Sequence, residues 1–274
     1  MKIALFFSGN YIRRYEIEEL TNLLKTKNKF LFFYYKKKKT IERSKINIFF
    51  DFFSTHGFFS LVLLEQKFAA IIGHKNSFYK KIEKILKKIE LNSFVKNYDK
   101  YEKFNFKTKK NRGRHIFDKS TIDKIINKNV NLIIFLGFNK LIDVKMLNLV
   151  KGGILSFHTA DTNKYKGRPS AFYEFLNNEK FGGVTLQRLS TKIDGGEIIG
   201  IKKINISTCK SYDETHYRML KLKKKMLVDG VNKIKLKKTF HKPKKTVLNK
   251  DKDSKNFLLV MKCIFKTIWK RYFF

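Results

Sequence analysis

The sequence predicts an α/β fold: an open, mostly parallel twisted sheet flanked by helices, with a short basic helical tail at the C-terminal end. Short apolar runs alternate along the chain with segments whose apolar residues recur at helical spacing. The apolar runs are continuous, which is typical of parallel strands that are buried on both faces. The chain has 274 residues, 43% of them hydrophobic, and is therefore long enough to bury a large core.

The N-terminal part of the chain predicts a strand, a tight loop and a helix, followed by further strands. Strands are expected at three continuous apolar runs, residues 2–7, 30–35 and 46–50. Helices are expected where apolar residues recur every three or four positions, in residues 11–25 and 61–70. The lysine-rich residues 80–115 favour no single type of element.

The next part of the chain predicts three more pairs of strand and helix. Strands are expected at residues 131–137, 154–157 and 183–189. Helices are expected at residues 120–127, 144–150 and 169–176. Ser120 or Thr121 is the expected N-cap of the first helix, and Pro169 the expected first residue of the last. Ligands of open parallel sheets bind at the carboxyl ends of strands, which is where His158 lies.

The composition changes after Ile206, which predicts an α/β domain in residues 1–206 and a basic extension in residues 207–274. Helices are expected at residues 211–228 and 256–274, joined by a charged linker. In the last helix Lys262, Lys266 and Lys270 follow at i, i+4 spacing among aromatic and aliphatic residues. Such a helix either lies on an anionic membrane surface or docks on its own domain.

The chain is strongly basic, with a formal net charge of +38. Only nine of the 61 basic residues are arginines, and the lysines are spread along the chain beside many Asn, Ile and Phe residues. A surface that reads phosphates favours arginine forks, so the excess lysine points first to a solvated surface. The alternative is an anionic partner such as tRNA, a nucleotide-linked substrate or anionic lipid.

Two features indicate a cytoplasmic protein without a bound metal. Cys209 and Cys263 are far apart and have no C-x-x-C spacing, so neither a zinc site nor a disulfide framework is expected. The apolar N-terminal run is too short for a signal peptide, and no apolar run is long enough to span a membrane. The sequence carries no signal for an oligomeric state.

His158 and Asp194 are the candidate catalytic residues. An imidazole at a strand end and a carboxylate before two glycines, Gly195 and Gly196, form an acid and base pair if the fold brings them together. Asp194 is then expected to accept a hydrogen bond from the ring and keep it protonated. The alternative is a structural histidine at the strand end and an aspartate that forms a turn.

Residues 131–200 extend this pattern over five linked motifs. In order, they are an apolar strand with its loop at residues 133–142, then Ser156-Phe157-His158, Tyr165-Lys166-Gly167-Arg168-Pro169, Gly183-Val184-Thr185 and Asp194-Gly195-Gly196. Their order and spacing resemble the catalytic half of the folate-dependent formyltransferases. The resemblance implies a formyltransferase-like, Rossmann-type fold and an enzyme that uses 10-formyltetrahydrofolate as the formyl donor.

The resemblance also implies roles for individual residues. His158 would stabilise the oxyanion formed when an amine attacks the formyl carbon, while Asp194 would tune the histidine and help to move protons. The expected folate-binding residues lie in two loops: Leu136, Gly137, Phe138, Asn139 and Leu141, with Asp194 and Gly195. No metal is implied.

One motif departs from the family, because Ser156 stands where these enzymes carry a catalytic asparagine. Loss of such a donor costs about 10² to 10³ in rate, unless another group compensates. Thr159 and Asn163 are candidates for that compensation. The Ser-Phe-His variant, together with Leu186-Gln187-Arg188-Leu189, resembles formyltransferase-like proteins linked with amino sugars.

The expected acceptor is the amine of a nucleotide-linked amino sugar. The loop Ser8-Gly9-Asn10 is shorter than the phosphate cradle of glycinamide ribonucleotide enzymes, and Arg168 is placed to meet a substrate anion. A methionyl-tRNA formyltransferase is the alternative. A second alternative is a non-catalytic protein on the same scaffold that binds nucleic acid or a membrane surface.

Overall fold

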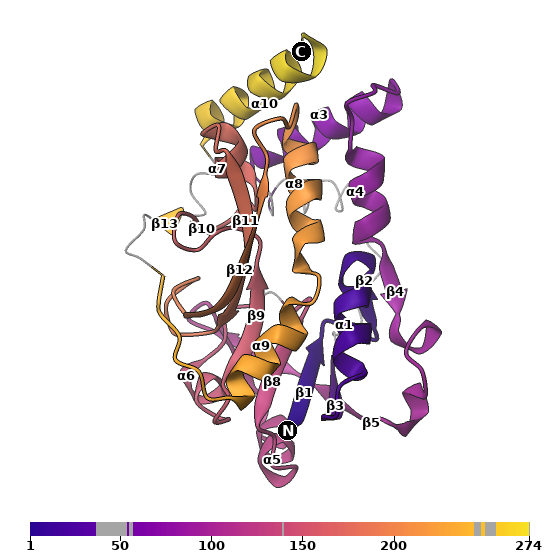
Figure 1. Cartoon of the computed structure of the whole chain (residues 1–274), viewed down its shortest axis with the longest axis vertical. Coiled ribbons are helices and arrows are strands. Elements are labelled where there is room, and N and C mark those ends of the chain that lie inside the picture. The colour runs from indigo at the N-terminus through magenta and orange to yellow at the C-terminus, as the bar shows by residue number, and fades with distance from the viewer. Residues whose placement is uncertain (37–53, 55–56, 139, 244–247, 250–255, 274) are drawn as a thin grey trace.

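The computed structural model describes residues 1–36, 54, 57–138, 140–243, 248–249 and 256–273. A seven-stranded sheet runs through the molecule in the order β12-β11-β9-β8-β1-β3-β5 (Figure 1). The strands are β1 (Lys2–Phe7), β3 (Lys29–Tyr35), β5 (Glu102–Phe106), β8 (Leu132–Leu136), β9 (Ile154–His158), β11 (Phe181–Arg188) and β12 (Glu197–Asn205). Strand β11 is antiparallel to both its neighbours and every other pair is parallel, which confirms the predicted fold class.

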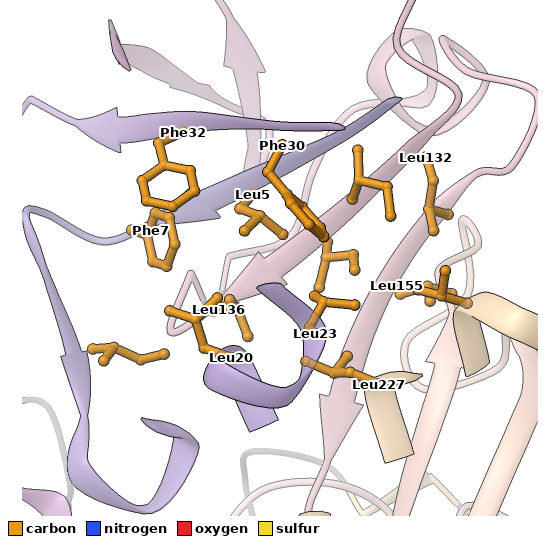
Figure 2. Close-up of a cluster of buried hydrophobic side chains, with 14 of the residues drawn as sticks. Leu5, Phe7, Leu20, Leu23, Phe30, Phe32, Leu132, Leu136, Leu155 and Leu227 are labelled. Carbon is orange, nitrogen blue, oxygen red and sulfur yellow. The ribbon is translucent and has the colours of Figure 1, made fainter. Parts of the chain in front are cut away.

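Each central strand buries both faces. In β1, Ile3, Leu5 and Phe7 join one core cluster, while Ala4 and Phe6 join another on the opposite face. The first cluster lies under α1 (Ile17–Leu24) and α9 (Met226–Lys235) and is drawn in Figure 2. The second lies under α5 (Lys119–Asn127) and α6 (Val144–Leu147).

A third cluster joins four helices beside the sheet: α3 (Phe59–Ile71), α7 (Phe172–Leu176), α8 (Tyr212–Leu220) and α10 (Phe257–Tyr272). Helix α10 lies at the end of the molecule opposite the N-terminus (Figure 1). Its inner face buries Val260, Cys263, Thr267 and Arg271. The helix thus docks on its own chain, and α9 completes the core over the sheet. The division at residue 206 stays a prediction.

Several predicted boundaries are wrong. Residues 11–13 form the short strand β2 (Tyr11–Arg13), because they pair with β4 (Lys88–Glu90). Pro169 does not begin a helix: Ala171 has a φ of 64°, a left-handed conformation that no helix accommodates, and α7 starts after it. Asp118, rather than Ser120 or Thr121, is at the N-cap of α5.

The remaining differences concern the C-terminal half and the lysine-rich segment. The expected helix at 144–150 ends at Leu147. The expected helix at 211–228 is two helices, α8 and α9, separated by Lys225 with a φ of 62°. Strand β12 was not predicted, and the unassigned segment holds α4 (Tyr79–Leu86), β4, β5 and the hairpin of β6 (Thr108–Asn111) and β7 (Arg114–Phe117).

A further pairing joins β10 (Lys166–Gly167) to β13 (Leu248–Asn249). The strand predicted at 46–50 lies outside the described residues. No helix among the described residues is long and apolar enough to cross a bilayer. In the same part of the chain, no group of three or more potential metal ligands comes together.

Candidate active site

His158 is the last residue of β9, at the carboxyl end of the strand. Because side chains alternate along a strand, Ser156 and His158 share a face and Phe157 points to the other. The adjacent strand β11 places Thr185 opposite His158 and Gln187 opposite Ser156. The cross-strand register therefore gathers polar side chains at one end of the sheet.

The structure brings His158 and Asp194 together. The imidazole Nδ1 lies 3.4 Å from Asp194 Oδ2. Both carboxylate oxygens are fixed by further donors: Gln187 Nε2 donates to Oδ1 at 2.9 Å, and the backbone N–H of Gly167 donates to Oδ2 at 2.9 Å. The carboxylate is thus oriented toward the ring by strand β11 and by Gly167 of strand β10.

The other ring nitrogen of His158, Nε2, differs from Nδ1 in its surroundings. Nε2 is buried and has no hydrogen-bond partner within the described residues. A proton on Nδ1, facing the carboxylate, leaves the Nε2 lone pair free to accept a proton. This orphaned nitrogen is the clearest sign that the site takes a ligand.

Burial lowers the pKa of His158 below its usual value of 6.5. Asp194 and the backbone of Tyr165 act in the opposite direction, while the charge of Lys223 adds to the lowering. The ring is therefore neutral at neutral pH. The expectation that Asp194 keeps it protonated in the free protein is wrong, because the cost of burying a charged imidazole exceeds the attraction of the carboxylate.

Two residues near the site were not assigned a role from sequence. Gln187 is buried and binds Asp194 from the position opposite Ser156, whereas the suggested compensating residue Asn163 donates its backbone N–H to Asp161. Lys223 is buried, with Nζ 4.6 Å from the centre of the Phe157 ring. Only the cross-strand register reveals Gln187.

A cavity of about 290 Å³ lies where the chain leaves β1 and β8. These adjacent strands connect in opposite directions across the sheet, which is where open α/β sheets bind ligands. The lining residues are Ser8, Tyr11, Ile12, Arg13, Glu16, Tyr35, Lys88, Gly137, Phe138 and Lys140. The three cations and one carboxylate among them make the cavity suitable for an anionic ligand.

The three residues of the first loop differ in their placement. Ser8 lines the cavity and donates its hydroxyl to the carbonyl of Gly137, which ties the loop after β1 to the loop after β8. Gly9 and Asn10 are not among the lining residues, and Asn10 accepts a hydrogen bond from Tyr98. The cavity therefore includes only part of the predicted substrate loop.

The predicted folate-binding residues of the loop after β8 differ in their exposure to solvent. Leu136 and Phe138 are buried, Leu141 is exposed, and Gly137 has a φ of 74°, which glycine adopts without strain. Asn139 lies outside the described residues.

The two predicted folate loops lie beside each other. Arg114 donates to the carbonyls of Ile142 and Thr191, at 2.8 and 2.7 Å, and so joins the loop after β8 to the loop that leads to Asp194 and Gly195. Arg168 is exposed, directly after the glycine that binds Asp194.

Comparison with known sequences gives a family match. Residues 67–231, more than half of the chain, match the model described as formyl transferase. Methionyl-tRNA formyltransferase from Thermotoga neapolitana is 27% identical over 116 residues, which cover 42% of this chain and 37% of that protein. The aligned part is thus well under half of that relative.

Comparison with solved structures gives the same architecture. A sugar N-formyltransferase from Shewanella sp. has a TM-score of 0.54 at 10% identity, over 98% of this chain and 88% of that chain. The N-formyltransferase from Helicobacter canadensis, in complex with folinic acid and dTDP-3-aminofucose, has a TM-score of 0.52 at 14% identity, over 92% and 72% of the two chains. At these identities the likeness establishes the fold.

Proposed function

The chain belongs to the formyl transferase family, and from that membership we propose that it transfers a formyl group from 10-formyltetrahydrofolate to a primary amine. The observation that carries the proposal is the His158–Asp194 pair, with the buried Nε2 of His158 left without a partner among the described residues. A base at that position, beside two loops that Arg114 joins, fits the acid and base chemistry of formyl transfer.

The donor supplies a formyl carbon that is activated toward attack by an amine. The loop containing Leu136, Gly137 and Leu141 and the loop containing Asp194 and Gly195 are the proposed walls around it. Arg114 binds a carbonyl on each side and therefore sets the spacing between these walls.

His158 is proposed to take up a proton at Nε2. The neutral ring accepts the proton that the amine loses as its bond to the formyl carbon forms, and the resulting imidazolium stabilises negative charge on the formyl oxygen. Asp194, held by Gln187 and Gly167, stabilises the charged ring and keeps Nδ1 protonated. The same proton then passes from Nε2 to the folate nitrogen, as the bond between this nitrogen and the formyl carbon breaks.

We propose a nucleotide-linked amino sugar as the acceptor. Arg13, Lys88 and Lys140 around the switch-point cavity suit a diphosphate, and the two structural neighbours described above are sugar N-formyltransferases or bind an amino-sugar nucleotide. Methionyl-tRNA is the alternative, supported by the names of the curated relatives and by the net charge of +38.

A panel of acceptors tests this proposal. The protein is incubated with 10-formyltetrahydrofolate and, in separate reactions, with dTDP- and UDP-linked amino sugars or with methionyl-tRNA, and the products are identified by mass spectrometry. We expect a formylated amino-sugar nucleotide. Formylation of methionyl-tRNA alone would select the alternative acceptor, and no formylated product from any amine would favour a non-catalytic binding protein.

The pH dependence of transfer follows from the lowered pKa of His158. Since the neutral ring is the base, kcat should fall on acidification, and the midpoint of this fall should lie below pH 6.5. In Asp194→Asn a charge that raises this pKa is lost, so the acidic limb should move to still lower pH. Both profiles are measured with one acceptor, so that titration of the acceptor cancels. A limb at the same pH in both proteins contradicts the proposed contact.

Ser156 and Gln187 lie opposite each other on β9 and β11. We expect their side chains together to supply the hydrogen-bond donor that the family's asparagine provides at position 156. Ser156→Asn should raise kcat, by up to about 10², because it restores an amide donor. Gln187→Met should lower kcat by about 10 to 10², because it frees Asp194. If the Gln187 amide compensates for Ser156, the gain from Ser156→Asn is larger in the Gln187→Met background. Equal gains in both backgrounds would limit Gln187 to holding Asp194.

A further inference from the structure

Helices α3 and α10 lie side by side at the end of the molecule opposite the N-terminus (Figure 1). Near their N-terminal ends the rings of Phe58 and Phe257 are 5.2 Å apart, and near their C-terminal ends the rings of His74 and Tyr272 are 4.3 Å apart. The two helices therefore run in the same direction over their whole length. Neither helix contributes a residue to the candidate active site.

Both helices carry a second apolar stripe on the side away from the core. In α3, Leu64, Phe68 and Ile71 follow at i, i+4 and i+7, and Phe68 and Ile71 are 62% and 73% exposed. Residues at this spacing share one face of the helix, and the buried Val62, Gln66 and Ala69 lie on the opposite one.

The stripe on α10 is richer in aromatic residues. Leu258, Phe265 and Trp269 are 76%, 64% and 58% exposed, and Tyr272 extends the same face. We call these two stripes the outer apolar face. A surface helix of a monomeric protein normally exposes polar residues on this side. The large number of exposed apolar side chains on these two helices therefore marks a contact surface.

The charges on these helices are almost all positive. Lys262 is exposed beside the apolar stripe of α10, Lys67 is exposed next to Phe68 on α3, and α10 contains no acidic residue. The carboxylate of Glu65 in α3 is paired with the buried Arg271 and so is neutralised. The outer apolar face is therefore bordered by lysines without opposing charge.

The face is held in place by the core. Arg271 binds Asp213 and Glu65, and the amide of Asn76 donates to the carbonyl of Arg271 at 3.1 Å. Lys266 donates to the carbonyls of Phe175 and Leu176. Helix α10 is thus anchored by its inner side, and its outer side is presented as a fixed surface.

We propose that the outer apolar face docks the protein on an anionic lipid bilayer, with Phe265 and Trp269 in the interfacial layer and the lysines against the headgroups. Aromatic and aliphatic residues beside lysines are the combination that binds such interfaces. A second copy of the chain is a poor occupant, because it would bring two net charges of +38 against each other. The proposal is independent of the acceptor.

Trp269 is the only tryptophan of the chain, so its fluorescence reports directly on this face. The full-length protein is mixed with vesicles of phosphatidylcholine alone or of phosphatidylcholine with phosphatidylglycerol. With the anionic vesicles we expect a shift of the emission to shorter wavelength and quenching by lipids brominated in the acyl chain. An emission unchanged by anionic vesicles overturns the proposal, even if the protein sediments with them, because charge alone would explain that binding.

A pair of variants separates insertion from general basicity. Leu258→Ser with Phe265→Ser should weaken sedimentation with anionic vesicles about tenfold or more, since two large apolar side chains no longer leave water. Phe181→Ser with Leu236→Ser, which removes exposed apolar residues elsewhere, should leave binding unchanged. Equal binding of both variants contradicts the proposal, as does a dimer in analytical ultracentrifugation that buries Trp269 without lipid.

Discussion

Replacing His158 by glutamine should lower kcat by about 10² to 10⁴, the range by which a positioned general base accelerates a reaction. Glutamine keeps much of the volume of the buried ring but has no basic nitrogen at the position of Nε2. Loss of Nε2 breaks no contact within the described part of the chain, whereas the substitution also removes the contact of Nδ1 with Asp194. Steady-state kinetics with 10-formyltetrahydrofolate and the preferred acceptor measure the effect.

The controls separate chemistry from folding. His241 is exposed, and His241→Gln should retain the wild-type rate. Thermal unfolding and the Kd for the folate should be nearly unchanged in His158→Gln, because the substitution removes a proton acceptor and leaves the two proposed folate loops in place. Wild-type turnover by His158→Gln would remove this residue from the mechanism.

Replacing Arg271 by methionine should lower the free energy of unfolding by about 3 to 5 kcal/mol, the cost of leaving a buried charge without its partner. Arg271 is fully buried and its Nη2 lies 2.8 Å from Asp213 Oδ1, which is equally buried. Asp213 also accepts the backbone N–H of Phe78 at 2.7 Å, so this carboxylate links α4 to α8 and α10. Urea unfolding at a single pH measures the difference.

A matched surface pair provides the comparison. Lys224 and Glu18 are 3.0 Å apart and both largely exposed, so Lys224→Met should change the free energy of unfolding by less than about 1 kcal/mol. Adding Asp213→Asn to Arg271→Met should recover part of the loss, because it removes the unpaired charge. A loss in Arg271→Met no larger than in Lys224→Met would show that the buried pair does not hold α10.

Three central strands could be predicted because their residues are apolar almost without interruption. Strands β1, β3 and β8 bury both faces, and such runs are recognisable in sequence. Strand β9 is shorter in apolar residues, because Ser156 interrupts the run and His158 ends it. Strand β5, with the sequence Glu-Lys-Phe-Asn-Phe, lies at the edge of the sheet and exposes several of its residues, so it resembles the lysine-rich loops around it. Strand β12 lies at the other edge of the sheet and ends in Ile-Lys-Lys-Ile-Asn, so its second half is also rich in lysine.

The candidate site could be predicted only where a residue is recognisable by its motif. His158 and Asp194 stand at conspicuous points, a strand end and a glycine loop, and the fold places them 3.4 Å apart. Gln187 depends on the register between β9 and β11, which the sequence does not specify. Lys223 is one of 52 lysines, 61 basic residues less nine arginines, and nothing local marks it as buried. Their catalytic roles remain predictions.

A crystal structure with a stable 10-formyl folate analogue tests the central claim most directly. We predict that the formyl group lies within hydrogen-bond distance of His158 Nε2, about 2.7 to 3.2 Å, with Asp194 still facing Nδ1. A folate bound away from the carboxyl end of β9, or a ring whose Nε2 turns away from the formyl group, would contradict it.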